Sequence, residues 1–159
     1  MTNFYFFDSS AVVKNYVAEI GSSWVKAIFN ATTTDIIYAA SITQVEVVAA
    51  FARRRKGLNL GVIDASVAIS QFKQDFQNDF REIELKPTII SQAILLSDKF
   101  SLRGYDAVQL ASALAVHAQL MNFKTQFSNS TFTFVSADNE LNLAAQAEGL
   151  KIENPNNYP

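Results

Sequence analysis

The chain has 159 residues, of which 49% are hydrophobic and 13 are phenylalanine, so we expect a packed single domain spanning residues 1–159 rather than a disordered chain. A net charge of −2 argues against a protein that coats nucleic acid through bulk positive charge, and the lack of cysteine excludes disulfides and thiolate zinc sites. No apolar run reaches the ~18 residues that span a bilayer, and the N-terminus lacks the basic flank of a signal peptide, so we expect a cytoplasmic protein.

The chain alternates short strand-like segments with longer helix-like segments. The strand-like segments are short apolar runs, and the helix-like segments repeat apolar residues at three- and four-residue spacing. The predicted strands are residues 3–7, 36–40, 81–85, 132–136 and 150–153. The predicted helices are residues 9–18, 22–30, 41–56, 60–80, 87–100, 104–121 and 139–148. Strands that alternate with helices predict an α/β protein whose parallel sheet carries helices on both faces.

Glycine and proline support several of these boundaries. Gly21 separates the first two helices, Pro87 suits the first turn of a helix, and Gly149 suits a C-cap. The polar stretch at residues 122–131 is predicted to be a loop. The helix at residues 60–80 carries one apolar stripe, which we expect to be core, formed by Ile69, Phe72, Phe76 and Phe80.

Four acidic residues occupy positions that a parallel sheet would bring to one rim. Asp8 ends the first predicted strand, Asp138 follows the fourth by two residues, and Glu46 and Asp106 lie near the starts of two helices. Ligands of open α/β sheets bind beyond the carboxyl ends of strands, where the strand order reverses. Carboxylates gathered there repel each other unless a cation neutralises them, and Mg²⁺ and Mn²⁺ prefer oxygen ligands. The pattern therefore predicts a metal-dependent hydrolase, and it leaves open whether one ion or two is held.

Each of these acids also has a structural interpretation. Asp8 and Asp138 precede helices, where aspartate is a favoured N-cap. Glu46 ends the sequence TQVE at residues 43–46, which fits a capping box. Asp106 lies in the first turn of its helix, where the helix dipole favours an anion. Any one acid is well explained in this way, and it is the combination of four at one rim that favours a metal site.

Two other polar features bear on the site. His117, the one histidine, lies eleven residues past Asp106 and therefore about 16 Å further along the helix, so we expect a packing or surface residue. The basic run at residues 53–56 ends a predicted helix, where cations complement the dipole. Arg53 also lies seven residues after Glu46, on the same face and about 10 Å away, which makes it a candidate contact for a substrate phosphate.

The segments around the four acids resemble the motifs of the PIN-domain ribonucleases, specifically the VapC-type toxins of bacterial toxin–antitoxin pairs. The matching segments are residues 7–14 (FDSSAVVK), 41–46 (SITQVE), 102–111 (LRGYDAVQLA), 136–141 (SADNEL) and 147–150 (AEGL). They span nearly the whole chain and keep the order of the family. The loop at residues 122–131 is longer than in many relatives, which bears on antitoxin docking and substrate choice rather than on the acidic pocket.

The resemblance implies a three-layer α/β/α sandwich around a five-stranded parallel sheet, assembled as a homodimer. It implies Mg²⁺- or Mn²⁺-dependent endonucleolytic cleavage of RNA, with a cognate antitoxin protein that occludes the pocket. The implied site comprises Asp8, Glu46, Asp106 and Asp138 as catalytic and metal-binding acids, Ser136 and Ser9 as supporting hydroxyls, and Arg53 as a substrate contact. We hypothesise that water on a metal held by Asp8, Asp106 and Asp138 attacks the phosphodiester, with Glu46 supporting a metal directly or through water.

One alternative comes from another functional class. A PIN-like scaffold can bind RNA or protein without cutting it, and such a module has no need of a metal site. The four acids present in this chain count against that alternative.

Overall fold

The computed structural model describes residues 2–31, 34–123 and 129–159. Its centre is one parallel sheet with the strand order β3-β2-β1-β4-β5. The strands are β1 (Phe4–Phe7), β2 (Ile36–Ala40), β3 (Phe80–Ile83), β4 (Phe132–Val135) and β5 (Lys151–Glu153). The chain starts at the middle of the sheet, builds outward to β3, and then returns to the other side of β1. The strand order therefore reverses between β1 and β4, which is where ligands of such sheets bind.

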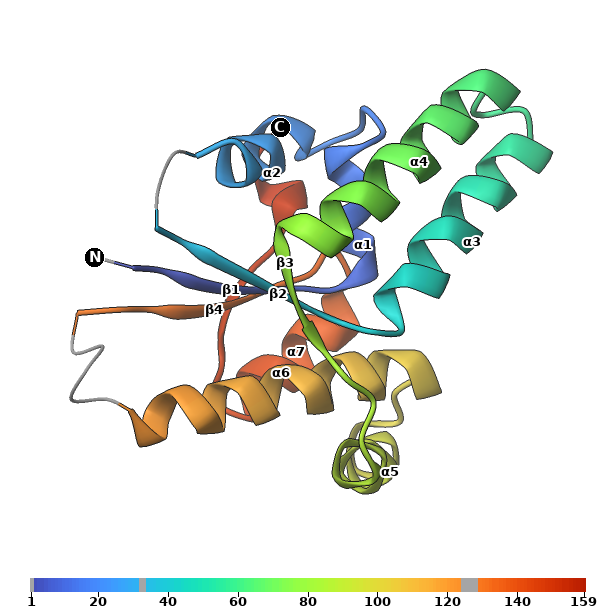
Figure 1. Cartoon of the computed structure of the whole chain (residues 1–159). Coiled ribbons are helices and arrows are strands. Elements are labelled where there is room, and N and C mark those ends of the chain that lie inside the picture. Colours follow the sequence, from blue (N-terminus) through green and yellow to red (C-terminus); the bar gives the residue numbers. More distant parts are fainter. Residues whose placement is uncertain (1, 32–33, 124–128) are drawn as a thin grey trace.

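Helices cover both faces of this sheet (Figure 1). One face carries α1 (Ser9–Val12), α2 (Ser22–Phe29), α3 (Thr43–Lys56) and α4 (Val62–Asn78). The other face carries α5 (Pro87–Phe100), α6 (Gly104–Asn122) and α7 (Asn139–Ala147). Two short 3₁₀ helices, η1 (Val13–Asn15) and η2 (Pro155–Asn157), complete the described elements. The three-layer α/β/α sandwich with a five-stranded parallel sheet is thus confirmed.

Successive side chains of the central strands enter opposite halves of the core. Phe6 and Phe134 stack at 5.9 Å between ring centroids in the half formed by α5, α6 and α7. Phe7 and Val135, the next residues along, are fully buried in the half formed by α1 to α4. Because both faces of these strands are covered, β1 and β4 are apolar except for the buried Thr133 of β4, instead of alternating with exposed polar residues. In the described part of the chain, no helix is long and apolar enough to cross a membrane.

Most predicted elements are present, with shifts of one to a few residues at their ends. The prediction of a helix at residues 9–18 is wrong in its second half, because α1 ends at Val12 and η1 continues only to Asn15. Side chains hold the chain beyond that point, where Lys14 donates to the Ile20 carbonyl at 2.8 Å and Ser22 to the Val17 carbonyl at 3.0 Å. These tertiary bonds replace the helical ones.

The apolar stripe of the long helix is buried as expected. Phe72 and Phe76 lie in the core under α4, with ring centroids 5.7 Å apart, and Ile69 packs against them partly buried. Phe80 is also buried, but it begins β3 rather than ending the helix, because its backbone pairs with Ile37 of β2. Residues 124–128 of the predicted 122–131 loop lie outside the described residues.

Candidate active site

Asp8 lies at the carboxyl end of β1, at the switch point of the sheet. It is 3% exposed, and its Oδ1 accepts hydrogen bonds from Ser10 Oγ at 2.7 Å and the Ala11 amide at 3.1 Å. Its Oδ2 accepts from Ser136 Oγ at 3.0 Å. Asp8 therefore does cap α1, as its structural interpretation predicts, and three donors also fix the plane of its carboxyl group.

Ser136 connects the two loops that follow β1 and β4. Its fully buried hydroxyl donates to Asp8 and accepts from the Asp138 amide at 3.0 Å. Asp138 Oδ1 in turn accepts from the Leu141 amide at 3.0 Å and caps α7. The hydroxyl of Ser10 makes a second link between these loops, because it accepts from the Ala137 amide at 2.9 Å, so two serine hydroxyls connect the loops that carry two of the predicted metal ligands.

Glu46 does not form the capping box that its sequence suggests. The helix α3 begins at Thr43 after Ile42, which makes no side-chain cap bond. Glu46 Oε2 instead accepts from Gln109 Nε2 at 2.6 Å, and the same nitrogen donates to Thr43 Oγ1 at 2.9 Å. The capping-box interpretation is wrong because this carboxylate accepts a hydrogen bond from Gln109 on α6 instead of from the backbone at the start of α3.

Gln109 is a site residue that the sequence analysis did not identify. It is 1% exposed on α6, one turn after Asp106, and its Oε1 is buried without a hydrogen-bond partner among the described residues. A buried amide is uncommon unless it has a specific task, because an unmade hydrogen bond in the core destabilises the fold. A glutamine within a run of alanine, valine and leucine was the available signal.

The four acids act on each other electrostatically along the rim. The pKa of Asp8 is raised to about 7, mainly by burial and to a smaller extent by the charge of Glu46, while the hydrogen bonds from Ser10, Ala11 and Ser136 lower it. Burial also raises the pKa of Glu46, and the charge of Asp106 raises it further. The pKa of Asp106 is raised in the same way, by burial and by the charge of Asp138. Among the described residues, no three acidic or histidine side chains lie close enough together to hold one ion. The acids thus share one rim without forming a closed ligand cage.

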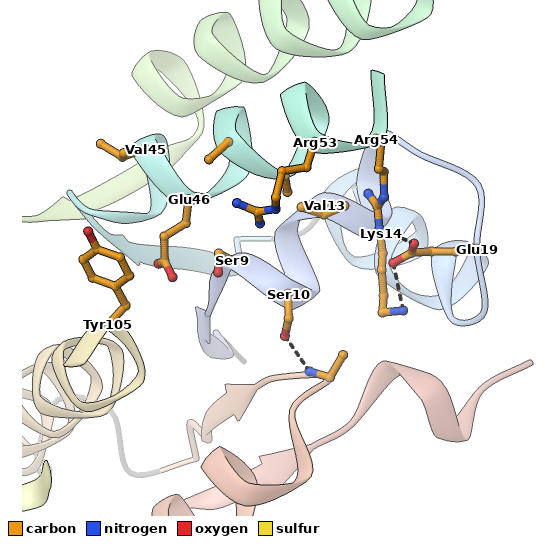
Figure 2. Close-up of a pocket in the computed structure, with 13 residues that line it drawn as sticks. Ser9, Ser10, Val13, Lys14, Glu19, Val45, Glu46, Arg53, Arg54 and Tyr105 are labelled. Carbon is orange, nitrogen blue, oxygen red and sulfur yellow. Dashed lines mark hydrogen bonds and ion pairs between the residues drawn. The ribbon is translucent and has the colours of Figure 1, made fainter. Parts of the chain in front are cut away.

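A cavity of about 450 Å³ opens beside this rim (Figure 2). Glu46 and Tyr105 stand at one end of it, and Arg53 reaches into it from α3 between that end and Lys14. The hydroxyl of Ser9 also lines the cavity, and its hydrogen bond to Glu46 lowers the pKa of that carboxyl, as does the charge of Arg53. Ser9 and Arg53, both predicted from sequence, are therefore neighbours of the acidic rim.

His117 lies away from the cavity. Its ring packs against Phe132 of β4 with centroids 5.3 Å apart, and the side chain is half-buried. This is the packing role that its position on the helix predicts.

The raised pKa of Asp8 predicts how the stability of the protein in EDTA depends on pH. Between about pH 4 and pH 7 the unfolded chain loses this proton and the folded protein keeps it, so stability falls as pH rises across that window. The Asp8→Asn variant lacks this titration. We expect the free energy of unfolding of the variant minus that of the wild type, measured with urea, to rise by roughly 1–4 kcal/mol between pH 4.5 and pH 7.5. A gap that stays constant with pH would contradict the assignment, and Asp98→Asn, an exposed acid on α5, is the control.

Comparisons with known proteins add evidence from relatives. No protein-family model matches the chain. Ribonuclease VapC45 of Mycobacterium tuberculosis is 36% identical over 111 residues, which cover 70% of this chain and 75% of that protein. The structure of VapBC2 from Rickettsia felis bound to a promoter DNA fragment has a TM-score of 0.61 at 13% identity, covering 95% of this chain and 98% of that chain. A toxin–antitoxin complex from Klebsiella pneumoniae has a TM-score of 0.57 at 15% identity, covering 95% and 97%.

The structural likenesses, at these low identities, show the shared fold. The sequence match is closer, and it extends over most of the length of both proteins. The chain therefore belongs to the VapC family of PIN-domain ribonucleases.

Proposed function

We propose that this protein is an endoribonuclease, the toxin of a toxin–antitoxin pair, which cleaves RNA phosphodiester bonds in the cytoplasm at the rim formed by Asp8, Glu46, Asp106 and Asp138. The observation that carries the proposal is the row of acids at the switch point of the sheet, in a chain that belongs to a ribonuclease family. A PIN-like module that binds without cutting is not favoured, because the relatives are named ribonucleases.

The donors at this rim fit a hard divalent cation such as Mg²⁺ or Mn²⁺. Every candidate ligand is a carboxylate, and the pKa values of Asp8, Glu46 and Asp106 are raised by full or partial burial and by the charge of a neighbouring acid. None of the ion pairs between described residues involves these acids. A cation would offset both their desolvation and their mutual repulsion. We infer that Asp8, Asp106 and Asp138 would hold it, with Glu46 assisting directly or through water. Binding would require these side chains to move closer together, because no three acids among the described residues lie close enough to hold one ion.

A divalent ion bound there would supply an activated water and would stabilise negative charge on the leaving oxygen. The protein side chains have separate tasks. Ser10, Ser136 and the Ala11 amide hold the Asp8 carboxyl in one orientation, and Gln109 holds that of Glu46. Arg53 presents its guanidinium to the cavity beside the acids, where it could contact a phosphate of the RNA.

The proposal includes two protein partners. Structural neighbours of this fold were determined as toxin–antitoxin complexes, which supports a cognate antitoxin for this chain. We also propose a homodimer. Its motivation is that Ile94 and Leu95, which are adjacent on α5, are each 64% exposed. Neighbouring exposed apolar side chains mark an interaction surface more often than single scattered ones do.

Expression of the wild-type protein without an antitoxin is expected to arrest bacterial growth, and Asp106→Asn is expected to relieve the arrest. The purified wild type should cleave single-stranded RNA with Mn²⁺ and lose this activity in EDTA, because the acids alone cannot activate water. Growth curves and a gel-based cleavage assay measure both effects, with Asp98→Asn as a control that stays toxic. Cleavage that survives EDTA would refute metal dependence. A wild type that is harmless and inert on RNA would favour the binding module.

A further inference from the structure

The end of the cavity away from Glu46 contains a buried lysine that the proposed chemistry does not use. Lys14 is 4% exposed, and its ammonium donates to Glu19 Oε1 at 3.1 Å and to the Ile20 carbonyl at 2.8 Å. Burying an ammonium group is costly unless it is paired. The lysine lines the same cavity as Glu46, on the far side of Arg53 (Figure 2).

Glu19 is shared between this lysine and an arginine. Its second oxygen, Oε2, accepts from Arg54 Nη2 at 2.7 Å, so one carboxylate bridges two cations from different elements. The other terminal nitrogen of the arginine, Nη1, is buried and has no hydrogen-bond partner among the described residues. A guanidinium presents a planar fork of donors that matches carboxylate or phosphate oxygens. Half of this fork is left without an acceptor.

Charge is unbalanced at this end of the cavity. Lys14, Arg53 and Arg54 are three cations, and Glu19 is the one carboxylate between them, so positive charge is in excess. Glu46, the one acid of the rim that lines the cavity, lies at the opposite end, past Arg53. A single strand of RNA bound along the cavity would place one phosphate near the acidic rim and a neighbouring phosphate near these three cations.

We propose that Lys14, Arg53 and Arg54 form a subsite for a backbone phosphate of the RNA beside the one that is cleaved, and that Glu19 occupies part of this subsite as a competing anion. The inference rests on the proposed ribonuclease function. The carboxylate holds the two cations in position when RNA is absent. A phosphate then displaces Glu19 from Arg54, and the rearranged guanidinium turns its buried Nη1 toward the new acceptor.

The test is the affinity for a fluorescein-labelled single-stranded RNA of mixed sequence, measured by anisotropy with EDTA in the Asp8→Asn background. Arg54→Gln is expected to weaken binding by roughly 3–10-fold and to reduce the salt slope by about 1. Glu19→Gln is expected to tighten binding by roughly the same factor, because it removes a competing anion. Arg55→Gln, an exposed cation of the same helix outside the cavity lining, should change affinity less than about twofold.

The sign of the Glu19→Gln effect separates the subsite from a purely structural ion pair. If Glu19 only braces the fold, this variant leaves RNA affinity unchanged or lowers it, and that result would overturn the proposal. Thermal unfolding of each variant identifies loss of fold, and Arg54→Lys, which keeps the charge, should bind more tightly than Arg54→Gln. Polyglutamate, a polymer with carboxylates and no phosphates, is the comparison ligand. If the variants change the affinity for polyglutamate but not the affinity for RNA, the proposed phosphate subsite is also overturned.

Failure of the subsite and failure of the ribonuclease function give different results. A wild type that cleaves RNA, with no effect of Arg54→Gln or Glu19→Gln on binding, overturns the subsite alone. A wild type that does not cleave RNA, with the expected changes in binding, refutes the nuclease and supports the subsite.

Discussion

Replacing Asp8 by asparagine is expected to abolish Mn²⁺-dependent RNA cleavage, lowering the rate by roughly 10³-fold, at the upper end of what removal of one preorganised polar group costs. The variant keeps the shape of the side chain and one oxygen for the cap of α1, but it removes the negative charge at the centre of the rim. Cleavage of a labelled RNA under single-turnover conditions measures the loss. Circular dichroism and urea unfolding are expected to show a folded protein that, in EDTA at neutral pH, is at least as stable as the wild type.

The matched control is Asp98→Asn, which makes the same chemical change on the exposed surface of α5. It should leave the cleavage rate within about twofold of the wild type, since surface substitutions away from the site have small effects. Equal cleavage by the wild type and Asp8→Asn would eliminate Asp8 as a metal ligand. Loss of activity with loss of fold would instead assign it a structural role.

Phe72→Ala is expected to destabilise the protein by about 3–5 kcal/mol, the usual cost of truncating a fully buried phenylalanine. The ring centroid lies 5.5 Å from that of Tyr16 and 5.7 Å from that of Phe76, so its removal leaves a cavity between α4 and Tyr16. For a chain of this size the midpoint of thermal unfolding should fall by roughly 6–20 °C. Urea unfolding and calorimetry measure the change.

Phe123→Ala is the control for this substitution, because Phe123 is 47% exposed at the end of α6. Its effect should stay within about 0.5 kcal/mol. If Phe72→Ala costs no more than Phe123→Ala, then α4 does not contribute to the cooperative core, and the packing described for this half of the molecule is incorrect.

The layers of the fold were predictable because periodicity reports burial directly. Apolar strands without alternation, such as Phe4–Phe7, require cover on both faces, and the stripe through Phe72 and Phe76 requires a helix against a core. The errors lie where distant segments decide local structure. The helix after Asp8 stops early because the side chains of Lys14 and Ser22 hold the chain beyond it.

The acids show a similar division. Aspartate at an N-cap and aspartate at a metal site have the same sequence signature, and Asp8 and Asp138 do cap their helices while also facing the rim. For Glu46 the local interpretation was a capping box. It is wrong because Gln109, 63 residues further along the chain, donates to that carboxylate. Local spacing carries no information about such a partner.

Sequence patterns were sufficient for the class of fold, the order of the elements and the family, since these depend on periodicity and on short motifs. The roles of the four acids stay a prediction. Only the tertiary structure showed that the strand order reverses between β1 and β4, that Ser136 links Asp8 to Asp138, and that Gln109 orients Glu46. It also placed Lys14 and Arg54 around Glu19 at the far end of the cavity. Hydrogen bonds and ion pairs act over a few ångströms in space, so residues from distant segments become partners only when packing brings them together.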